Sequence, residues 1–164
     1  KKIMKHVILM RHAKSDWKLA GLTDHQRPLN KRGVHDAPLM GASIKKRGII
    51  PELVLVSDAK RTQETWSLLS PLFEGAQTKF DAELYLASSE IILAKLQEVN
   101  HLIDTVLLLA HNPGITEAFL RLANINTSGI PTSGVCCIRL HTDDFKNTLK
   151  CKKELVYFTY PAEL

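Results

Sequence analysis

Hydrophobic positions along this chain follow two alternating patterns. Short apolar runs typical of buried strands occupy residues 6–10, 53–56, 105–110, 135–140 and 155–160, with a weaker run at 78–80. Between these runs, apolar residues recur at helical spacing over residues 36–47, 59–69, 88–100 and 115–124. This alternation predicts an α/β protein in which helices cover both faces of a largely parallel sheet.

The expected helix ends rest on prolines and glycines. The first helix is expected to open near Asp36, because Pro38 is tolerated only in an opening turn, and to stop at Gly48. Pro71 closes the second helix. No repeat, low-complexity tract or linker divides the sequence, so residues 1–164 are expected to form one domain.

Composition narrows the class of protein. A chain of 164 residues with 45% hydrophobic content can bury a proper core. No apolar run approaches the roughly 20 residues that span a bilayer, and no signal-peptide pattern precedes residue 6. Cys136, Cys137 and Cys151 form no CxxC pair, which favours a reducing compartment. We therefore expect a cytoplasmic protein without membrane contact; a monomer is the working expectation, although the sequence does not determine the oligomeric state.

The net charge of +5 favours anionic ligands, among them phosphorylated proteins and nucleic acid. Aromatic residues do not interleave with basic ones on the predicted strands, as single-strand binding would favour, so nucleic acid is not an expected partner. The sequence contains no HExxH, no GxxxxGK[ST] and no DxD motif. No metal ion or cofactor is expected.

Chemically active residues follow three of the predicted strands. The first strand leads into Arg11 and His12, the second into Ser57, and a third into His111. Arg61 falls in the first turn of the helix that Ser57 is expected to cap. Each residue alone has an ordinary explanation as a turn, cap or surface residue. Because ligands of open α/β sheets bind at the carboxyl ends of the strands, together they predict one anion site.

That combination suits a phosphoryl group. Two guanidiniums match a tetrahedral oxyanion, and Ser57 is a further candidate contact to it. Neighbouring cations disfavour protonation of His12, which leaves a neutral, nucleophilic imidazole near pH 7. His111 is placed to donate a hydrogen bond as charge builds on the phosphoryl oxygens. Arginines then supply the charge that a metal ion supplies in other enzymes.

Six ordered motifs extend this interpretation to a known family: RHAKSDW at 11–17, RPLNKRG at 27–33, VLVSDAKRTQET at 54–65, ELYLAS at 83–88, LLLAHNPGI at 107–115 and IPTSGV at 130–135. Over about residues 7–140 the chain closely resembles the histidine phosphatase superfamily, and more narrowly its SixA-like phosphohistidine phosphatases. The resemblance implies that His12 is the nucleophile and becomes phosphohistidine. It also implies that Arg11, Arg61 and His111 complete the phosphate pocket.

The same resemblance implies a phosphoglycerate mutase-like fold, a three-layer α/β/α sandwich around a mostly parallel sheet with one antiparallel strand. The glycine usual after the nucleophile is Ala13 here, as in the SixA-like branch. The chain lacks the length for the large cap domain with which many members select small phosphorylated metabolites. Without such a cap, the pocket is expected to be open and shallow and to suit a phosphoryl group that is presented on a protein surface.

The general acid is the open point of the chemistry. Cleavage of an alkyl phosphoester requires an acid to protonate the departing alkoxide, whereas a protonated imidazole leaves with less assistance. Glu83 and Asp16 are the candidate acids. Each also has an ordinary interpretation, Glu83 as a solvated loop carboxylate and Asp16 as a turn residue. Arg27 is interpreted as structural or as a cation at the rim of the substrate site.

Three functional hypotheses remain. The first is a metal-independent phosphohistidine phosphatase that acts on phosphorylated protein through a phosphohistidine intermediate on His12. The second is a broad phosphomonoesterase for small phosphorylated molecules, whose turnover depends on Glu83 or Asp16. The third is a non-catalytic phosphate- or nucleic-acid-binding module. The sequence does not show whether the segment from Lys14 to Gln26 folds over the pocket.

Overall fold

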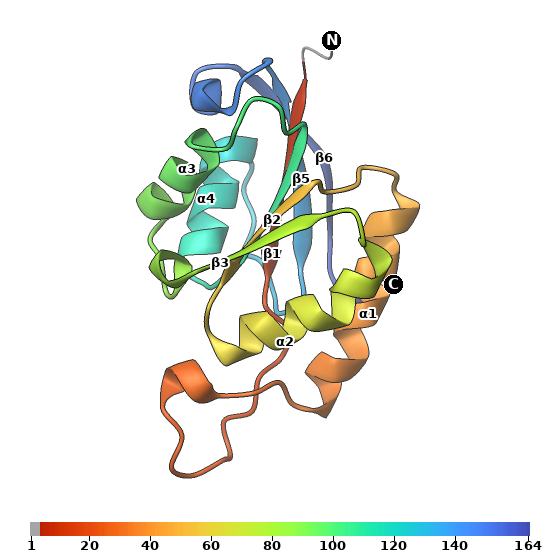
Figure 1. Cartoon of the computed structure of the whole chain (residues 1–164), viewed down its shortest axis with the longest axis vertical. Coiled ribbons are helices and arrows are strands. Elements are labelled where there is room, and N and C mark those ends of the chain that lie inside the picture. Colours follow the sequence, from red (N-terminus) through yellow and green to blue (C-terminus); the bar gives the residue numbers. More distant parts are fainter. Residues whose placement is uncertain (1–3) are drawn as a thin grey trace.

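The computed structural model describes residues 4–164, so residues 1–3 of the predicted domain lie outside the described chain. The described residues form a six-stranded sheet in the order β3-β2-β4-β1-β5-β6 (Figure 1). The strands are β1 (Lys5–Arg11), β2 (Leu53–Ser57), β3 (Gln77–Asp81), β4 (Thr105–Ala110), β5 (Val135–His141) and β6 (Lys152–Thr159). The α-helices are α1 (Lys31–Lys46), α2 (Lys60–Leu69), α3 (Ser89–Gln97) and α4 (Gly114–Ala123).

Strand directions confirm the predicted sheet. β1 pairs with β4 in parallel, and β2 pairs in parallel with both β4 and β3. β5 is antiparallel to β1 and to β6, so within the described chain it is the one strand that runs against the others. The carboxyl ends of β1, β2 and β4 therefore meet at one edge of the sheet.

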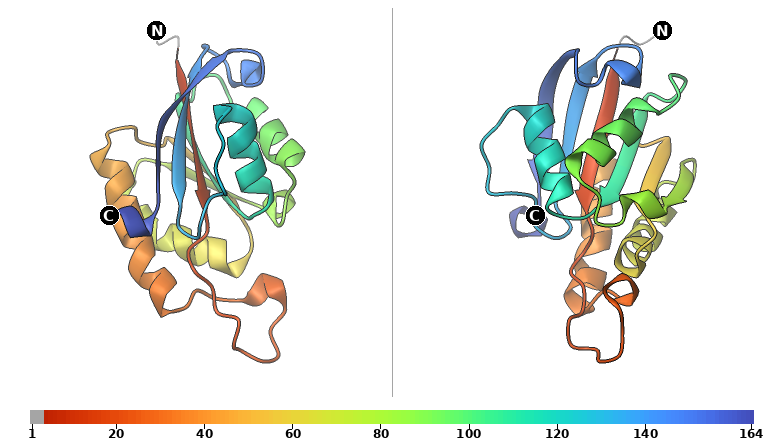
Figure 2. Two further views of the ribbon diagram at one scale, coloured as in Figure 1. Left: turned by 180° about the vertical axis from the view of Figure 1, so that it is seen from behind. Right: turned by 90° about the vertical axis from the view of Figure 1, so that its left-hand side faces the viewer.

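The central strands are apolar on both sides because helices cover both faces (Figure 2). Val7 and Leu9 of β1 pack in the cluster formed with α3 and α4, whereas Ile8 and Met10 pack with α1 and α2. All four side chains are fully buried, and each contributes on the order of 1.5–3 kcal/mol of transfer free energy. The three-layer α/β/α architecture is thereby confirmed.

Helix α1 begins earlier than the sequence predicted. The side chain of Asn30 caps it by accepting a hydrogen bond of 2.9 Å from the Gly33 amide. Pro38 lies inside the helix, so the expectation that it marks the opening turn was wrong. Pro38 has no N–H for the carbonyl of Val34, but Val34 is half exposed, and water can solvate that turn.

The segment between β1 and α1 projects from the carboxyl end of β1, at the bottom of Figure 1. It includes a short 3-10 turn over Asp24–Gln26. No large cap domain is inserted among the described elements. None of the described helices combines the length and apolar character needed to cross a membrane.

Candidate active site

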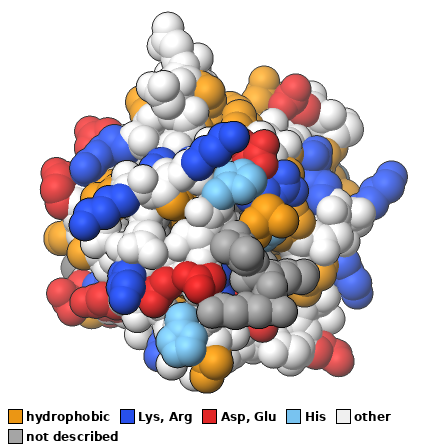
Figure 3. Space-filling model, turned by 90° about the horizontal axis from the view of Figure 1, so that it is seen from above, with side chains coloured by type: hydrophobic (Ala, Val, Ile, Leu, Met, Phe, Trp, Pro, Cys, Tyr) orange, Lys and Arg blue, Asp and Glu red, His pale blue; other side chains and the backbone are white. Residues whose placement is uncertain are grey.

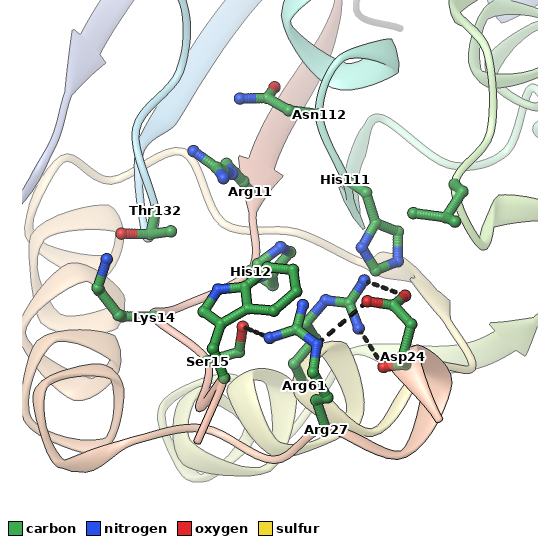
Figure 4. Close-up of a pocket in the computed structure, with 12 residues that line it drawn as sticks. Arg11, His12, Lys14, Ser15, Asp24, Arg27, Arg61, His111, Asn112 and Thr132 are labelled. Atoms are coloured by element: carbon green, nitrogen blue, oxygen red, sulfur yellow. Dashed lines mark hydrogen bonds and ion pairs between the residues drawn. The ribbon is translucent and has the colours of Figure 1, made fainter. Parts of the chain in front are cut away.

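A cavity of about 280 Å³ opens at the carboxyl ends of β1 and β4 (Figure 4). Its walls contain four of the predicted site residues, namely Arg11, His12, Arg61 and His111. The remaining lining residues are Lys14, Ser15, Trp17, Asp24, Arg27, Leu86, Asn112 and Thr132. The structure thus brings together both arginines and both histidines that the strand ends predicted.

His12 follows β1 directly and is 6% exposed. Its Nδ1 lies 2.8 Å from the carbonyl oxygen of Ala13. Because a carbonyl only accepts, Nδ1 carries the proton and Nε2 keeps its lone pair. Burial lowers the pKa of His12 to about 3; the Ala13 carbonyl acts in the opposite sense, and the charges of Arg61 and Arg11 add to the lowering. At pH 7 the imidazole is therefore neutral and nucleophilic.

His111 follows β4, with its ring centroid 5.2 Å from that of His12. Its Nε2 lies 2.8 Å from Ser57 Oγ, which accepts the Ala59 N–H at 3.3 Å and so has its own proton free to donate. The Nδ1 atom of His111 has no hydrogen-bond partner among the described residues. Burial, followed by the charges of His12 and Arg61, lowers the pKa of His111 to about 3.

Ser57 has a different place from the one predicted. The N-cap of α2 is Ala59, which makes no side-chain cap hydrogen bond, so the prediction of Ser57 as the cap was wrong. Ser57 is fully buried and does not line the cavity. Its hydroxyl lies behind His111, where it orients the imidazole instead of facing a phosphate.

The two arginines differ in how they are held. Arg61, 3% exposed, donates to the backbone oxygen of Asp24 at 2.8 Å and to its Oδ2 at 3.0 Å. Arg11 donates to the Ile130 carbonyl at 3.2 Å. The buried Nε atoms of both arginines have no partner in the described part of the chain. Both guanidiniums therefore retain donors for an anion in the cavity.

Asp24 is a site residue that the sequence did not reveal. Burial raises the pKa of Asp24, but hydrogen bonds from the Tyr85 hydroxyl, Arg61 and Arg27 outweigh it and bring the pKa to about 2. The carboxylate is thus ionised at any pH near neutrality. Asp24 stands three residues before Arg27 in an irregular segment, and no periodicity singles it out.

Arg27 proves to be both structural and part of the cavity wall. It donates from Nε to Asp24 Oδ1 at 3.1 Å and from a terminal nitrogen to Ser15 Oγ at 2.7 Å. Its guanidinium carbon lies 3.4 Å from the ring centroid of Trp17. These contacts hold the segment between β1 and α1 together, and Asp24 of that segment in turn pairs with Arg61.

Neither predicted acid lines the cavity. The Glu83 side chain is 74% exposed and forms an ion pair with Lys95 at 3.0 Å. Asp16 Oδ1 accepts the backbone N–H of Lys18 at 2.7 Å, and its side chain lines a neighbouring cleft. Among the lining residues, Asp24 is the one carboxylate. The described residues also place no group of three or more His, Cys, Asp and Glu side chains that could hold a metal ion.

Comparisons with known proteins agree with this geometry. The model of the histidine phosphatase superfamily (branch 1) matches residues 7–85, the stretch that contains Arg11, His12 and Arg61. The crystal structure of SixA from Agrobacterium tumefaciens superposes with a TM-score of 0.84 at 27% identity, over 96% of this chain and 98% of that one. The chain belongs to the histidine phosphatase superfamily.

Other similar proteins match this chain to different extents. A structure described as the protein histidine phosphatase SixA complexed with tungstate has a TM-score of 0.81 at 23% identity and covers 96% of this chain and 98% of that one. An uncharacterized chloroplastic protein of Arabidopsis thaliana is 33% identical over an alignment of 129 residues that covers 71% of this chain. The present chain spans 58% of the length of that relative.

Proposed function

We propose that this histidine phosphatase hydrolyses phosphohistidine in a phosphorylated protein, through a covalent phosphohistidine on His12. The observation that supports this most strongly is that the cavity contains a neutral nucleophile, three arginines and a single carboxylate, which is held ionised. An alkoxide leaving group needs a proton from an acid, whereas a protonated phosphoimidazole leaves as neutral imidazole. A site with these groups suits cleavage of an N–P bond better than of an alkyl ester.

The first step forms a bond from His12 Nε2 to phosphorus while the N–P bond of the substrate breaks. The departing ring keeps the electron pair of that bond and the proton on its other nitrogen. On His12 the proton stays at Nδ1, hydrogen-bonded to the Ala13 carbonyl. The phosphorylated ring is therefore cationic, which makes it a good leaving group for the next step.

In the second step a water oxygen attacks phosphorus, and the electron pair of the breaking bond returns to His12 Nε2. One water proton passes to solvent, and inorganic phosphate leaves. In both steps Arg11 and Arg61 face the phosphoryl oxygens, and the Nδ1–H of His111 donates to them as their charge grows. No step requires a cofactor.

Brief exposure to a labelled phosphodonor in EDTA tests this proposal. Acid-labile, base-stable label is expected on the wild type and on His101→Ala, whose histidine is exposed, but not on His12→Ala. If no donor labels the wild type while a phosphopeptide still binds, the enzyme proposal fails and a phosphate-binding module becomes the better account.

A comparison of substrates distinguishes this proposal from the alternative of a broad phosphomonoesterase for small molecules. We expect kcat/KM for a phosphohistidine peptide to exceed that for sugar phosphates, and Glu83→Gln and Asp16→Asn to leave turnover of either within about twofold, because neither side chain lines the cavity. Efficient turnover of several sugar phosphates that is lost in either variant would favour the small-molecule enzyme.

A further inference from the structure

A second cleft adjoins the cavity and shares three of its wall residues, Lys14, Ser15 and Trp17. This basic cleft measures about 550 Å³, and its other walls come from Asp16, Lys18, Asn30, Lys31 and Arg32. Trp17 stands between the two spaces, 75% exposed, with its ring stacked on the guanidinium of Arg27. A chain that places its phosphoryl group in the cavity can continue over Trp17 into the basic cleft.

The cleft carries an excess of positive charge. Four cations line it against one carboxylate, that of Asp16. Within the described chain no ion pair involves Lys14, Lys18 or Lys31, and Arg32 is 68% exposed with a single partner at 3.5 Å. The uncompensated charge is therefore available to a ligand.

Two of these cations also lie where a positive charge lowers the stability of a helix. Lys31 and Arg32 lie in the first turn of α1, which contains no acidic residue. A positive charge at that end of a helix opposes the helix dipole, so stability alone does not account for them.

The opposite end of the molecule has a different charge pattern. Figure 3 shows that end, where basic and acidic side chains lie interleaved. Ion pairs join Arg139 to Glu154 at 3.1 Å and Lys146 to Asp144 at 3.8 Å. Such compensation by carboxylates is what the basic cleft beside the cavity has little of.

We infer that the basic cleft binds an acidic segment that flanks the phosphorylated residue of the protein substrate. This inference rests on the proposed function, which supplies the reaction in the adjoining cavity. An acidic segment is the occupant whose charge complements the four cations of the cleft. Because Trp17 lines both spaces, such a segment can be continuous with a residue whose phosphoryl group lies in the cavity. Free phosphohistidine fills the cavity alone and gains nothing from the cleft.

The test compares three substrates: free phosphohistidine, a phosphohistidine peptide with acidic flanks, and the same peptide with neutral flanks. The cleft variant is Lys18→Glu, Lys31→Glu and Arg32→Glu combined, none of which lines the cavity. Its matched control is Lys146→Glu, Lys150→Glu and Lys152→Glu, which changes the net charge equally. We expect the cleft variant to raise KM for the acidic peptide about tenfold and to leave kcat/KM for free phosphohistidine within about twofold.

Other outcomes overturn the inference in distinguishable ways. If flanking charge makes no difference, or if the control variant raises KM as much as the cleft variant does, the cleft has no specific role while the phosphatase stands. Tighter binding of a single-stranded oligonucleotide than of the acidic peptide at this cleft would also overturn it. If no substrate is turned over by the wild type, the proposed function itself fails.

Discussion

At the scale of single residues, both imidazoles of the site are neutral near pH 7, because burial lowers the pKa of each to about 3. The Ala13 carbonyl holds the proton of His12 on Nδ1 and leaves Nε2 free to attack. For His111 the proposed mechanism requires the reverse, with the Ser57 hydroxyl donating to Nε2 across 2.8 Å and the proton on Nδ1. In that mechanism one neutral ring is the nucleophile and the other is a hydrogen-bond donor.

Ser57→Ala removes the group that holds the His111 proton on Nδ1 in the proposed mechanism. A neutral hydrogen bond contributes about 0.5–1.5 kcal/mol, so kcat is expected to fall up to about tenfold with KM unchanged. Nitrogen NMR shifts of His111 should show a smaller fraction of the Nδ1–H form. Ser67→Ala, an exposed serine of α2, should change neither quantity. An unaltered tautomer in Ser57→Ala would contradict the orienting role.

Asp24 acts on this scale by holding Arg61 and Arg27, and its pKa of about 2 leaves it no proton to donate near neutrality. Asp24→Asn is expected to lower kcat/KM about tenfold, since a hydrogen bond to a charged group is worth about 1.5–3 kcal/mol and the amide retains part of it. The factor should be the same for leaving groups of different basicity. A loss that grows with leaving-group pKa would identify Asp24 as a general acid instead.

At the scale of elements, the start of α1 packs directly on the chain that follows the nucleophile. The Lys14 carbonyl accepts the Asn30 N–H at 3.0 Å. A Cβ on Gly33 would lie 2.2 Å from that same carbonyl oxygen. A glycine is needed at position 33 because the helix and the loop after His12 approach backbone to backbone.

Gly33→Ala is therefore expected to push this loop from its place. We expect a loss of about 1–3 kcal/mol in the free energy of unfolding, together with a lower kcat. Urea denaturation and steady-state kinetics measure the two effects. Gly75→Ala is the matched control, because a Cβ there meets nothing within 4 Å. Equal stability of the two variants would show that the approach at Gly33 relaxes freely.

At the scale of the whole molecule, the buried site makes stability depend on pH. Both His12 and His111 have pKa values of about 3 in the folded chain, against about 6.5 in an unfolded one. Between these values the unfolded state binds more protons than the folded state, so stability is lost as pH falls from about 6.5 toward 3. Asp24, with a pKa of about 2, titrates below this window.

Acidification from pH 7.5 to 5 should cost about 2 kcal/mol of unfolding free energy for each of these two histidines. His12→Gln should reduce the pH dependence by about half of their joint contribution, whereas His101→Gln, at an exposed position, should leave it unchanged. Urea titrations of the three proteins at both pH values measure it. Parallel curves for wild type and His12→Gln would mean that His12 is not held neutral.

Predictions from the sequence were confirmed where a feature of the structure depends on a local pattern of residues. Apolar runs located the strands and helical spacing located the helices, because burial acts on each segment separately. Arg11, His12 and His111 could be placed together because parallel strands end at one edge. Pro38 misled, since its cost at an exposed turn is small compared with the packing of the rest of α1.

The sequence by itself determined the sheet and brought forward the residues that we propose bind and attack a phosphoryl group, since both follow from local patterns. Only the tertiary structure decided which carboxylate stands in the site. Asp24 lies in the irregular segment between β1 and α1 and contacts Tyr85 and Arg61, which are 61 and 37 residues away in the sequence, so these contacts depend on the path of the chain in space. The tautomer of His12 was decided in the same way, because the position of its proton depends on the carbonyl that Nδ1 meets.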